Sequence, residues 1–267
     1  MSSKALQEMK VKYIIIDEIS MVPEIFYKYF CIIKKFRPDI KFSIAGDYAQ
    51  LQPVKDRIGN FNYKNSWCLN ELVDGNRLQL TKCRRSDDKL FNMLLPKTIG
   101  KIKPSDFGSK FTERHITFTN KNRIQINKTM MNQKSFNNKY LQLDKLEYDD
   151  NSQNVKLTND TPIIARKNAK ELDIFNNEQF IIKDIEFEKE NITMASDIDD
   201  EKIINIPFEM FQKLFYPAYA ITIYKSQGST FDHPYTIHEW NHPLFDNRLK
   251  YVALSRSSAL ENINVFI

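Results

Sequence analysis

Glycine is scarce in this sequence, and the positions of the few glycines exclude two common nucleotide-binding loops. Six glycines occur among 267 residues. The dinucleotide-binding fingerprint Gly-x-Gly-x-x-Gly is absent. The phosphate-binding Walker A pattern, Gly-x-x-x-x-Gly-Lys-Ser/Thr, is absent as well, because the one Gly-Lys step, Gly100-Lys101, is followed by Ile102.

Long apolar runs, paired cysteines and a large excess of one charge are also lacking. No apolar stretch approaches the length of a membrane span, and the first residues do not form a signal-peptide core, so we expect an intracellular protein with no membrane partner. The three cysteines are widely spaced, which predicts reduced packing residues and no disulfide framework or zinc site. The net charge of +5 permits a polyanionic partner but does not require one.

The first part of the chain has the pattern of a parallel α/β sheet. Residues 11–16 form an apolar run typical of a buried strand, and Pro23 is suited to begin a helix that ends near Phe36. Residues 40–45 have the pattern of a second buried strand. A strand, a helix and a strand in succession predict parallel pairing of the two strands.

The remaining residues predict a second α/β region that is interrupted by a small β module. The interruption consists of short β-rich runs separated by acidic and asparagine-rich turns, with Asn176-Asn177 at a position typical of a hairpin turn. We predict strands at residues 77–81, 115–118, 162–165, 179–185, 191–194, 202–206, 218–224, 235–238 and 262–267, and helices at residues 87–95 and from 119 to about 140.

The pattern predicts three parts, two of which are sheet domains with parallel strands. Residues 1–75 form a first, partial α/β domain. Residues 76–143 and 207–267 form a second α/β domain, and residues 144–206 form the β module inserted into it.

Polar groups follow both strands of the first domain. Asp17-Glu18 follows the first apolar run, and Gly46-Asp47 follows the second, with Gln50 a few residues later in the string Gly46-Asp-x-x-Gln50-Leu-x-Pro53-Val54. Two consecutive carboxylates at the end of a buried strand can hold Mg²⁺ and activate a water molecule. Taken alone, the pair is equally well explained as the solvated end of a strand.

Two further strings lie in the second domain. One is Thr222-Ile-Tyr-Lys225-Ser226-Gln227-Gly228-Ser-Thr230, whose hydroxyls, backbone N–H groups and lysine could receive phosphate oxygens. The other is Tyr251-Val-Ala-Leu-Ser255-Arg256. For Arg256 considered by itself, a surface ion pair is the simpler interpretation.

The order and spacing of these strings resemble motifs II, III, V and VI of superfamily 1 helicases. The Lys-Ser-Gln-Gly form and the inserted β module are most similar to the RecD-like branch, superfamily 1B. The segment from Leu80 to Ser86 resembles motif IV, and His115 to Arg123 resembles the strand end that follows it. The resemblance implies two RecA-like domains, of which the first is truncated, and an SH3-like insert in the second.

The resemblance implies a role for each matching residue. Asp17 would coordinate Mg²⁺, in part through water, and Glu18 would be the catalytic base. Gln50 would sense the γ-phosphate of ATP, and Arg85 and Arg256 would act as arginine fingers. Asp47, Gln227 and Gly228 would belong to the nucleotide site, and Thr222, Lys225, Ser226 and Thr230 would contact the backbone of single-stranded DNA.

These roles describe the motor-core part of an ATP-dependent DNA helicase. Because the Walker A loop is absent, we expect this chain to need a Walker A-bearing segment or partner polypeptide for activity. A non-catalytic nucleic-acid-binding or adaptor protein derived from a helicase is the alternative. Three histidines, His233, His238 and His242, fall close together, but their spacing favours a structural loop over a metal site.

Overall fold

The protein forms two compact units in the computed structural model, which describes residues 10–53, 64–199 and 201–267. Unit 1 consists of residues 1–84 with 247–252, and unit 2 consists of residues 85–246 with 253–267. Val54 of the second string lies outside the described residues. Each unit is described by itself below.

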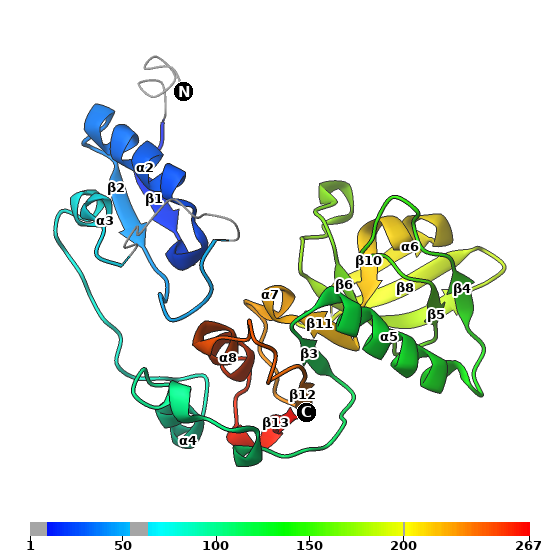
Figure 1. The fold of residues 1–267 in the computed structure, drawn as a ribbon. Coiled ribbons are helices and arrows are strands. Elements are labelled where there is room, and N and C mark those ends of the chain that lie inside the picture. The colour runs from blue at the N-terminus through cyan, green and yellow to red at the C-terminus, as the bar shows by residue number, and fades with distance from the viewer. Residues whose placement is uncertain (1–9, 54–63, 200) are drawn as a thin grey trace. The chain divides into compact units, whose positions relative to one another are not determined.

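Unit 1 contains a two-stranded parallel sheet covered on one face by helices (Figure 1). Strand β1 (Tyr13–Ile16) pairs with β2 (Lys41–Ile44), and Tyr13 lies opposite Lys41. The short helix η1 (Ile19–Met21) and helix α2 (Glu24–Phe36) connect them, and α3 (Trp67–Leu72) follows. The buried side chain of Tyr27 packs with residues of β1 and α3 in the core of this unit.

The second face of this sheet is bare among the described residues. Tyr13 and Ile15 of β1 are 70% and 78% exposed, whereas Ile16 is buried. The alternation follows from the two-residue period of a strand, which directs successive side chains to opposite faces. The prediction of a buried strand therefore holds for only one face of β1 among the described residues, because α2 and α3 cover that face alone.

Unit 2 contains a four-stranded parallel sheet in the order β11-β3-β12-β13. Its strands are β11 (Ala220–Thr222), β3 (His115–Thr117), β12 (Tyr235–Ile237) and β13 (Ile263–Val265). Helix α5 (Asn120–Ser135) follows β3 directly and packs against β3, β11 and β5. Thr119 begins this helix by accepting a hydrogen bond from the backbone N–H of Asn122.

The inserted module is a five-stranded antiparallel sheet in the order β10-β6-β7-β8-β9. Its strands are β6 (Pro162–Ala165), β7 (Gln179–Glu186), β8 (Asn191–Ser196), β9 (Ile203–Pro207) and β10 (Phe215–Pro217), and α6 (Phe208–Leu214) lies between the last two. A hairpin of β4 (Leu141–Leu143) and β5 (Val155–Leu157) precedes it. Phe180, Phe211 and Phe215 share one buried core with Met130 of α5.

Several boundaries differ from the predicted ones. The antiparallel sheet continues to Pro217, because β10 pairs with β6, so the predicted end of the insert at residue 206 is too early. Residues 77–81 form no strand; Leu78 and Leu80 are exposed and have no partner strand in the described chain. The predicted strand at residues 218–224 ends at Thr222, where α7 (Ile223–Ser226) begins.

The short helices complete the description. These are α4 (Asp88–Met93), α8 (Asn247–Leu254), η2 (Ile99–Lys101), η3 (Pro104–Asp106), η4 (Lys170–Leu172) and η5 (Leu260–Asn262). None of the helices in the described ranges is long and apolar enough to cross a membrane.

Candidate functional site

The carboxyl ends of β1 and β2 bring the first two predicted strings together in unit 1. The backbone N–H of Ile19 donates to the carbonyl of Ala45 at 3.0 Å, and Ala45 donates to the carbonyl of Ile16 at 2.8 Å. A Cβ on Gly46 would lie 2.7 Å from the backbone nitrogen of Ile19, so only glycine fits there without displacement. Asp17-Glu18 and Gly46-Asp47 therefore leave the sheet at the same edge.

Glu18 has a strained backbone at this edge. Its φ of 48° lies in the left-handed region, which non-glycine residues rarely adopt. Its N–H donates to the Asp17 carboxylate at 2.8 Å, and its Oε2 is buried without a hydrogen-bond partner in the described chain. Strain of this kind and an unpaired buried oxygen are found at functional sites, where a ligand or water meets the orphaned group.

The turn after β2 holds Gln50 next to the same edge. Asp47 accepts a hydrogen bond from the N–H of Ala49 at 2.9 Å, and its carbonyl accepts from the N–H of Gln50 at 3.0 Å. These bonds are those of an Asx-type turn, which fixes the backbone that carries the Gln50 amide. One Asp47 oxygen is thus used for the turn itself.

The carboxylates fit Mg²⁺ only together with other ligands. Among the described residues, no three His, Cys, Asp or Glu side chains form a group that could hold a metal ion. Mg²⁺ commonly takes one or two protein carboxylates and fills its other positions with water and phosphate oxygens. The exposed Asp17 carboxylate beside Glu18 suits that arrangement.

In unit 2, the Lys-Ser-Gln-Gly turn is closed by its own hydroxyls. Thr222 is buried and accepts from the N–H of Lys225 at 3.4 Å. Ser226 is fully buried and donates to the carbonyl of Ile223 at 2.8 Å. Gly228 has a φ of 86°, while Thr230 is exposed. Both buried hydroxyls therefore hold the turn in place, and the predicted DNA contacts of Thr222 and Ser226 stay predictions.

Arg256 contacts the backbone of this turn. Its residue is 2% exposed, and its Nη1 lies 3.3 Å from the carbonyl oxygen of Ser229 and 3.5 Å from that of Ser226. Arg256 therefore does not lie at the surface, which is where the residue by itself would be expected, because its guanidinium is buried against backbone carbonyls. In this arrangement Arg256 stabilises the conformation of the Ser-Gln-Gly turn.

Arg85 differs from Arg256 in being exposed. The residue two positions later, Asp87, begins α4 by accepting from the N–H of Leu90 at 2.8 Å. The second oxygen of Asp87 accepts from the N–H of Leu260 at 2.7 Å, and its own N–H donates to the carbonyl of Ser258 at 3.0 Å. These bonds tie the chain after Arg85 to the segment that follows Arg256.

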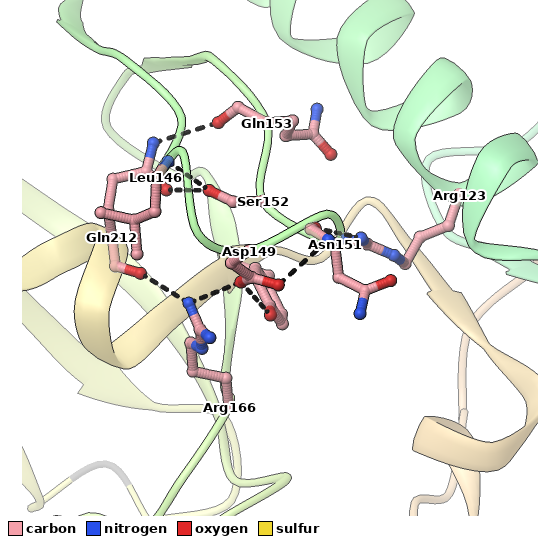
Figure 2. Close-up of polar contacts among 9 residues, drawn as sticks. Arg123, Leu146, Asp149, Asn151, Ser152, Gln153, Arg166 and Gln212 are labelled. Carbon is pink, nitrogen blue, oxygen red and sulfur yellow. Dashed lines mark hydrogen bonds and ion pairs between the residues drawn. The ribbon is translucent and has the colours of Figure 1, made fainter.

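Sequence reasoning missed a cluster of polar residues next to α5 (Figure 2). Asp149 pairs with Arg166 at 2.7 Å and accepts from the hydroxyl of Tyr216 at 2.7 Å. The buried Arg123 donates to the carbonyl of Asn151 at 2.6 Å, and both arginines lie about 5 Å from the centre of the Tyr216 ring, at 5.0 and 4.9 Å. Burial first, and then the hydrogen bond to Asp149, raise the pKa of Tyr216 to about 12. No local sequence pattern indicates this cluster, because its members are far apart in the sequence.

A pair of histidines in the parallel sheet was also missed. The Nδ1 of His115 lies 3.0 Å from the Nε2 of His238, and both rings are buried. Burial and the neighbouring ring lower the pKa of His115 to about 3, and burial lowers that of His238 to about 4. His238 is therefore a neutral core residue in a pair that joins β3 to the end of β12.

Comparisons with known proteins support the fold. No family model and no curated protein matches this chain. Among solved structures, Pif1 helicase from Candida albicans is similar with a TM-score of 0.72 and 18% identity, over 98% of this chain and 73% of that one. Pif1 helicase from Bacteroides in complex with ADP-AlF3 and single-stranded DNA gives a TM-score of 0.66 and 21% identity, over 99% of this chain and 72% of that one.

A third structure, described as the basis for DNA unwinding at forked double-stranded DNA by two coordinating Pif1 helicases, gives a TM-score of 0.65 and 21% identity. The match covers 99% of this chain and 71% of that one. The chain therefore shares the fold of these Pif1 helicase structures, and the predicted α/β fold with RecA-like parallel sheets is confirmed.

Proposed function

We propose that this chain is the motor-core part of an ATP-dependent DNA helicase that translocates on single-stranded DNA. The observation that carries the proposal is the convergence of Asp17-Glu18 and Gly46-Asp47 at one edge of the unit 1 sheet. The strained backbone and the orphaned Oε2 of Glu18 support a catalytic position for that residue. The solved Pif1 structures with ADP-AlF3 and with single-stranded DNA support ATP and DNA as ligands.

Four residues of the chain have proposed roles in ATP hydrolysis. When bound, Mg²⁺ neutralises charge on the phosphate oxygens of ATP. Asp17 would hold the ion, directly or through water, and Glu18 would take a proton from the attacking water. Gln50 positions that water by hydrogen bonding, without adding charge. The exposed guanidinium of Arg85 is the candidate that stabilises negative charge on the transferred phosphoryl group.

The residues of unit 2 form the nucleic-acid side of the proposal. Lys225 and Thr230 contact the DNA backbone, and Thr222 and Ser226 keep the turn closed beneath them. Gln227 and Gly228 connect this turn to the nucleotide. Arg256 contributes mainly by holding the carbonyls of Ser226 and Ser229.

An uncovered surface of unit 1 supports the proposal that a Walker A-bearing segment completes it. A groove of about 600 Å³ is lined by all four residues of β2 and by residues 73–74 and 76–78. Among the described residues, β2 pairs only with β1, so its other edge is available to a further strand. The bare apolar face of β1 extends the surface. A parallel strand followed by a phosphate-binding loop and a helix would cover both features, whether a longer form of this chain or a second polypeptide supplies it.

The test is ATP hydrolysis and DNA binding by the chain alone and in a form completed with a Walker A-bearing segment. We expect the chain alone to bind single-stranded DNA in a salt-sensitive way without DNA-stimulated hydrolysis. We expect hydrolysis to appear in the completed form. Binding without hydrolysis in both forms would favour the adaptor function instead, and no binding in either form would contradict both.

A further inference from the structure

The lysine of the unit 2 turn is held by residues outside every helicase-like string. The Nζ of Lys225 donates to the Oδ1 atoms of Asn176 and Asn177 at 3.0 and 2.6 Å. Both asparagines lie in the loop between β6 and β7, in the antiparallel module. The module therefore reaches the turn through this loop.

The loop is fixed in place by its backbone. Asn177 has a φ of 72°, a left-handed conformation that asparagine tolerates, and its N–H donates to the carbonyl of Ala165 at 3.0 Å. The N–H of Asn176 donates to the Oδ1 of Asn168 at 2.8 Å. Two side-chain amides thus face the ammonium group from a rigid turn.

A second contact joins the module to the far side of the same turn. The Nε2 of Gln179, the first residue of β7, donates to the hydroxyl of Ser229 at 2.9 Å. The turn from Lys225 to Ser229 is therefore held at both of its ends by the antiparallel module.

The surroundings of Lys225 carry an excess of positive charge. Lys225 forms no ion pair with any described residue; its two partners are neutral amides. Arg166 shares the carboxylate of Asp149, while Arg123 is 3% exposed and its Nη1 has no hydrogen-bond partner in the described ranges. Burial, and then the charges of Arg123 and Arg166, lower the pKa of Lys225. Such a site favours an anion beside the lysine.

We propose that Asn176 and Asn177 are positioning residues that hold the Lys225 ammonium ready for a phosphate group of single-stranded nucleic acid. This inference rests on the proposed function and adds the β6–β7 loop to its DNA site. Neutral amide oxygens hold an ammonium without cancelling its charge, whereas a carboxylate would form an ion pair that the phosphate must break. An ammonium has three donors, so the two amides leave one of them for a phosphate oxygen.

The test compares four variants of the full chain by titrating fluorescent single-stranded oligonucleotide over a range of salt concentrations. Lys225→Gln removes the charge, and the slope of log K against log salt should become shallower by about 0.7. Asn177→Gly keeps the left-handed backbone but removes the amide, and should weaken binding about threefold with the slope unchanged, because the charge remains. Asn177→Asp offers Lys225 a carboxylate and should weaken binding about tenfold. Asn132→Asp, at an exposed position on α5, introduces the same charge as a control.

The double variant Lys225→Gln with Asn177→Asp decides between positioning and general repulsion. Because the aspartate acts through Lys225, its effect should largely disappear when the lysine is absent. An equal loss of binding from Asn177→Asp with and without Lys225 would overturn the inference, and so would an equal loss from Asn132→Asp. The inference would also be overturned if Asn177→Gly bound like the wild type and Lys225→Gln left the salt slope unchanged. Thermal unfolding of each variant separates these results from loss of the fold. Failure of the wild-type chain to bind would instead contradict the proposed function together with the inference.

Discussion

The Nζ of Lys225 lies 2.6 Å from the Oδ1 of Asn177, a residue 48 positions away in the sequence. The pair joins a string that resembles a helicase motif to a loop of the inserted module that belongs to none. The module is therefore part of the structure that shapes the turn, and its loop carries a share of the interactions that place the lysine. Substitutions in the module can consequently affect a function that the motifs alone would assign to the parallel-sheet region.

Replacing the two arginines predicted as fingers should affect stability to different extents. Arg256→Ala removes a buried guanidinium that contacts the carbonyls of Ser226 and Ser229, and should lower the free energy of unfolding by about 2–4 kcal/mol. Arg85→Ala removes an exposed side chain and should leave stability within about 0.5 kcal/mol of the wild type. Urea unfolding followed by circular dichroism checks both values. Equal stability of the two variants would contradict the structural role of Arg256.

In the Walker A-completed form, Arg85→Ala should lower DNA-stimulated ATP turnover by about 10³-fold if its guanidinium stabilises the transferred phosphoryl group. The steady-state rate at saturating DNA is the measurement. A rate within twofold of the wild type would remove Arg85 from the catalytic residues.

Asp149→Asn should destabilise unit 2 strongly. The substitution leaves the partly buried Arg166 without its ion-pair partner next to the buried Arg123, and we expect a loss of about 3–5 kcal/mol. Tyr216→Phe removes only one hydrogen bond to the same carboxylate and should cost about 1 kcal/mol. Chemical unfolding of both variants measures the difference, and an equally mild effect of Asp149→Asn would show that the cluster contributes little.

Acid should destabilise unit 2 through the His115–His238 pair. Burial holds the folded-state pKa values near 3 and 4, below the ordinary value of about 6.5, so the unfolded chain binds protons first as the pH falls. The stability present above about pH 6.5 should therefore be lost progressively between about pH 6.5 and 3, by up to about 8 kcal/mol for the two rings together.

The control for this pH dependence is His115→Gln, which removes one of the two titrating rings. Its unfolding free energy should fall less steeply over the same pH range than that of the wild type. Identical slopes for both proteins would assign the acid sensitivity to other groups.

Gly46→Ala should separate the two strand ends that form the candidate catalytic edge. The added Cβ would meet the backbone nitrogen and the Cγ2 of Ile19 at 2.7 and 2.9 Å. We expect a loss of about 1–3 kcal/mol from overpacking and a large fall in hydrolysis by the completed form. Full activity with wild-type stability would contradict the close approach of the strand ends.

Local pattern predicted most elements, because a strand or helix of this protein is largely specified by its own residues. The apolar run before Asp17 forms β1, and Thr119 begins α5 at the expected strand end. The prediction of a strand at residues 77–81 is wrong because a strand also needs a partner, and none is present in the described chain. The bare face of β1 was likewise invisible in its sequence, since a run of isoleucines is the same whether one or both faces are covered.

The sequence identifies the strings that make up the candidate site, but it does not predict the contacts that their side chains make. Asp17, Glu18 and Gly46 could be placed at one sheet edge, because parallel strands share the direction of their carboxyl ends. The buried position of Arg256, the orphaned oxygen of Glu18 and the partners of Lys225 depend on residues from distant segments. These details follow from tertiary packing, which a single sequence does not reveal.

The most direct test of the central claim is the ATP turnover of Glu18→Gln in the Walker A-completed form, measured with saturating single-stranded DNA beside Glu71→Gln. Both variants replace one carboxylate by an amide, but Glu71 lies exposed on α3 and belongs to neither of the strings that follow β1 and β2. We predict that Glu18→Gln loses turnover by at least about 10²-fold while still binding DNA, and that Glu71→Gln remains like the wild type. Turnover by Glu18→Gln equal to that of Glu71→Gln would contradict the assignment of a catalytic base at the end of β1.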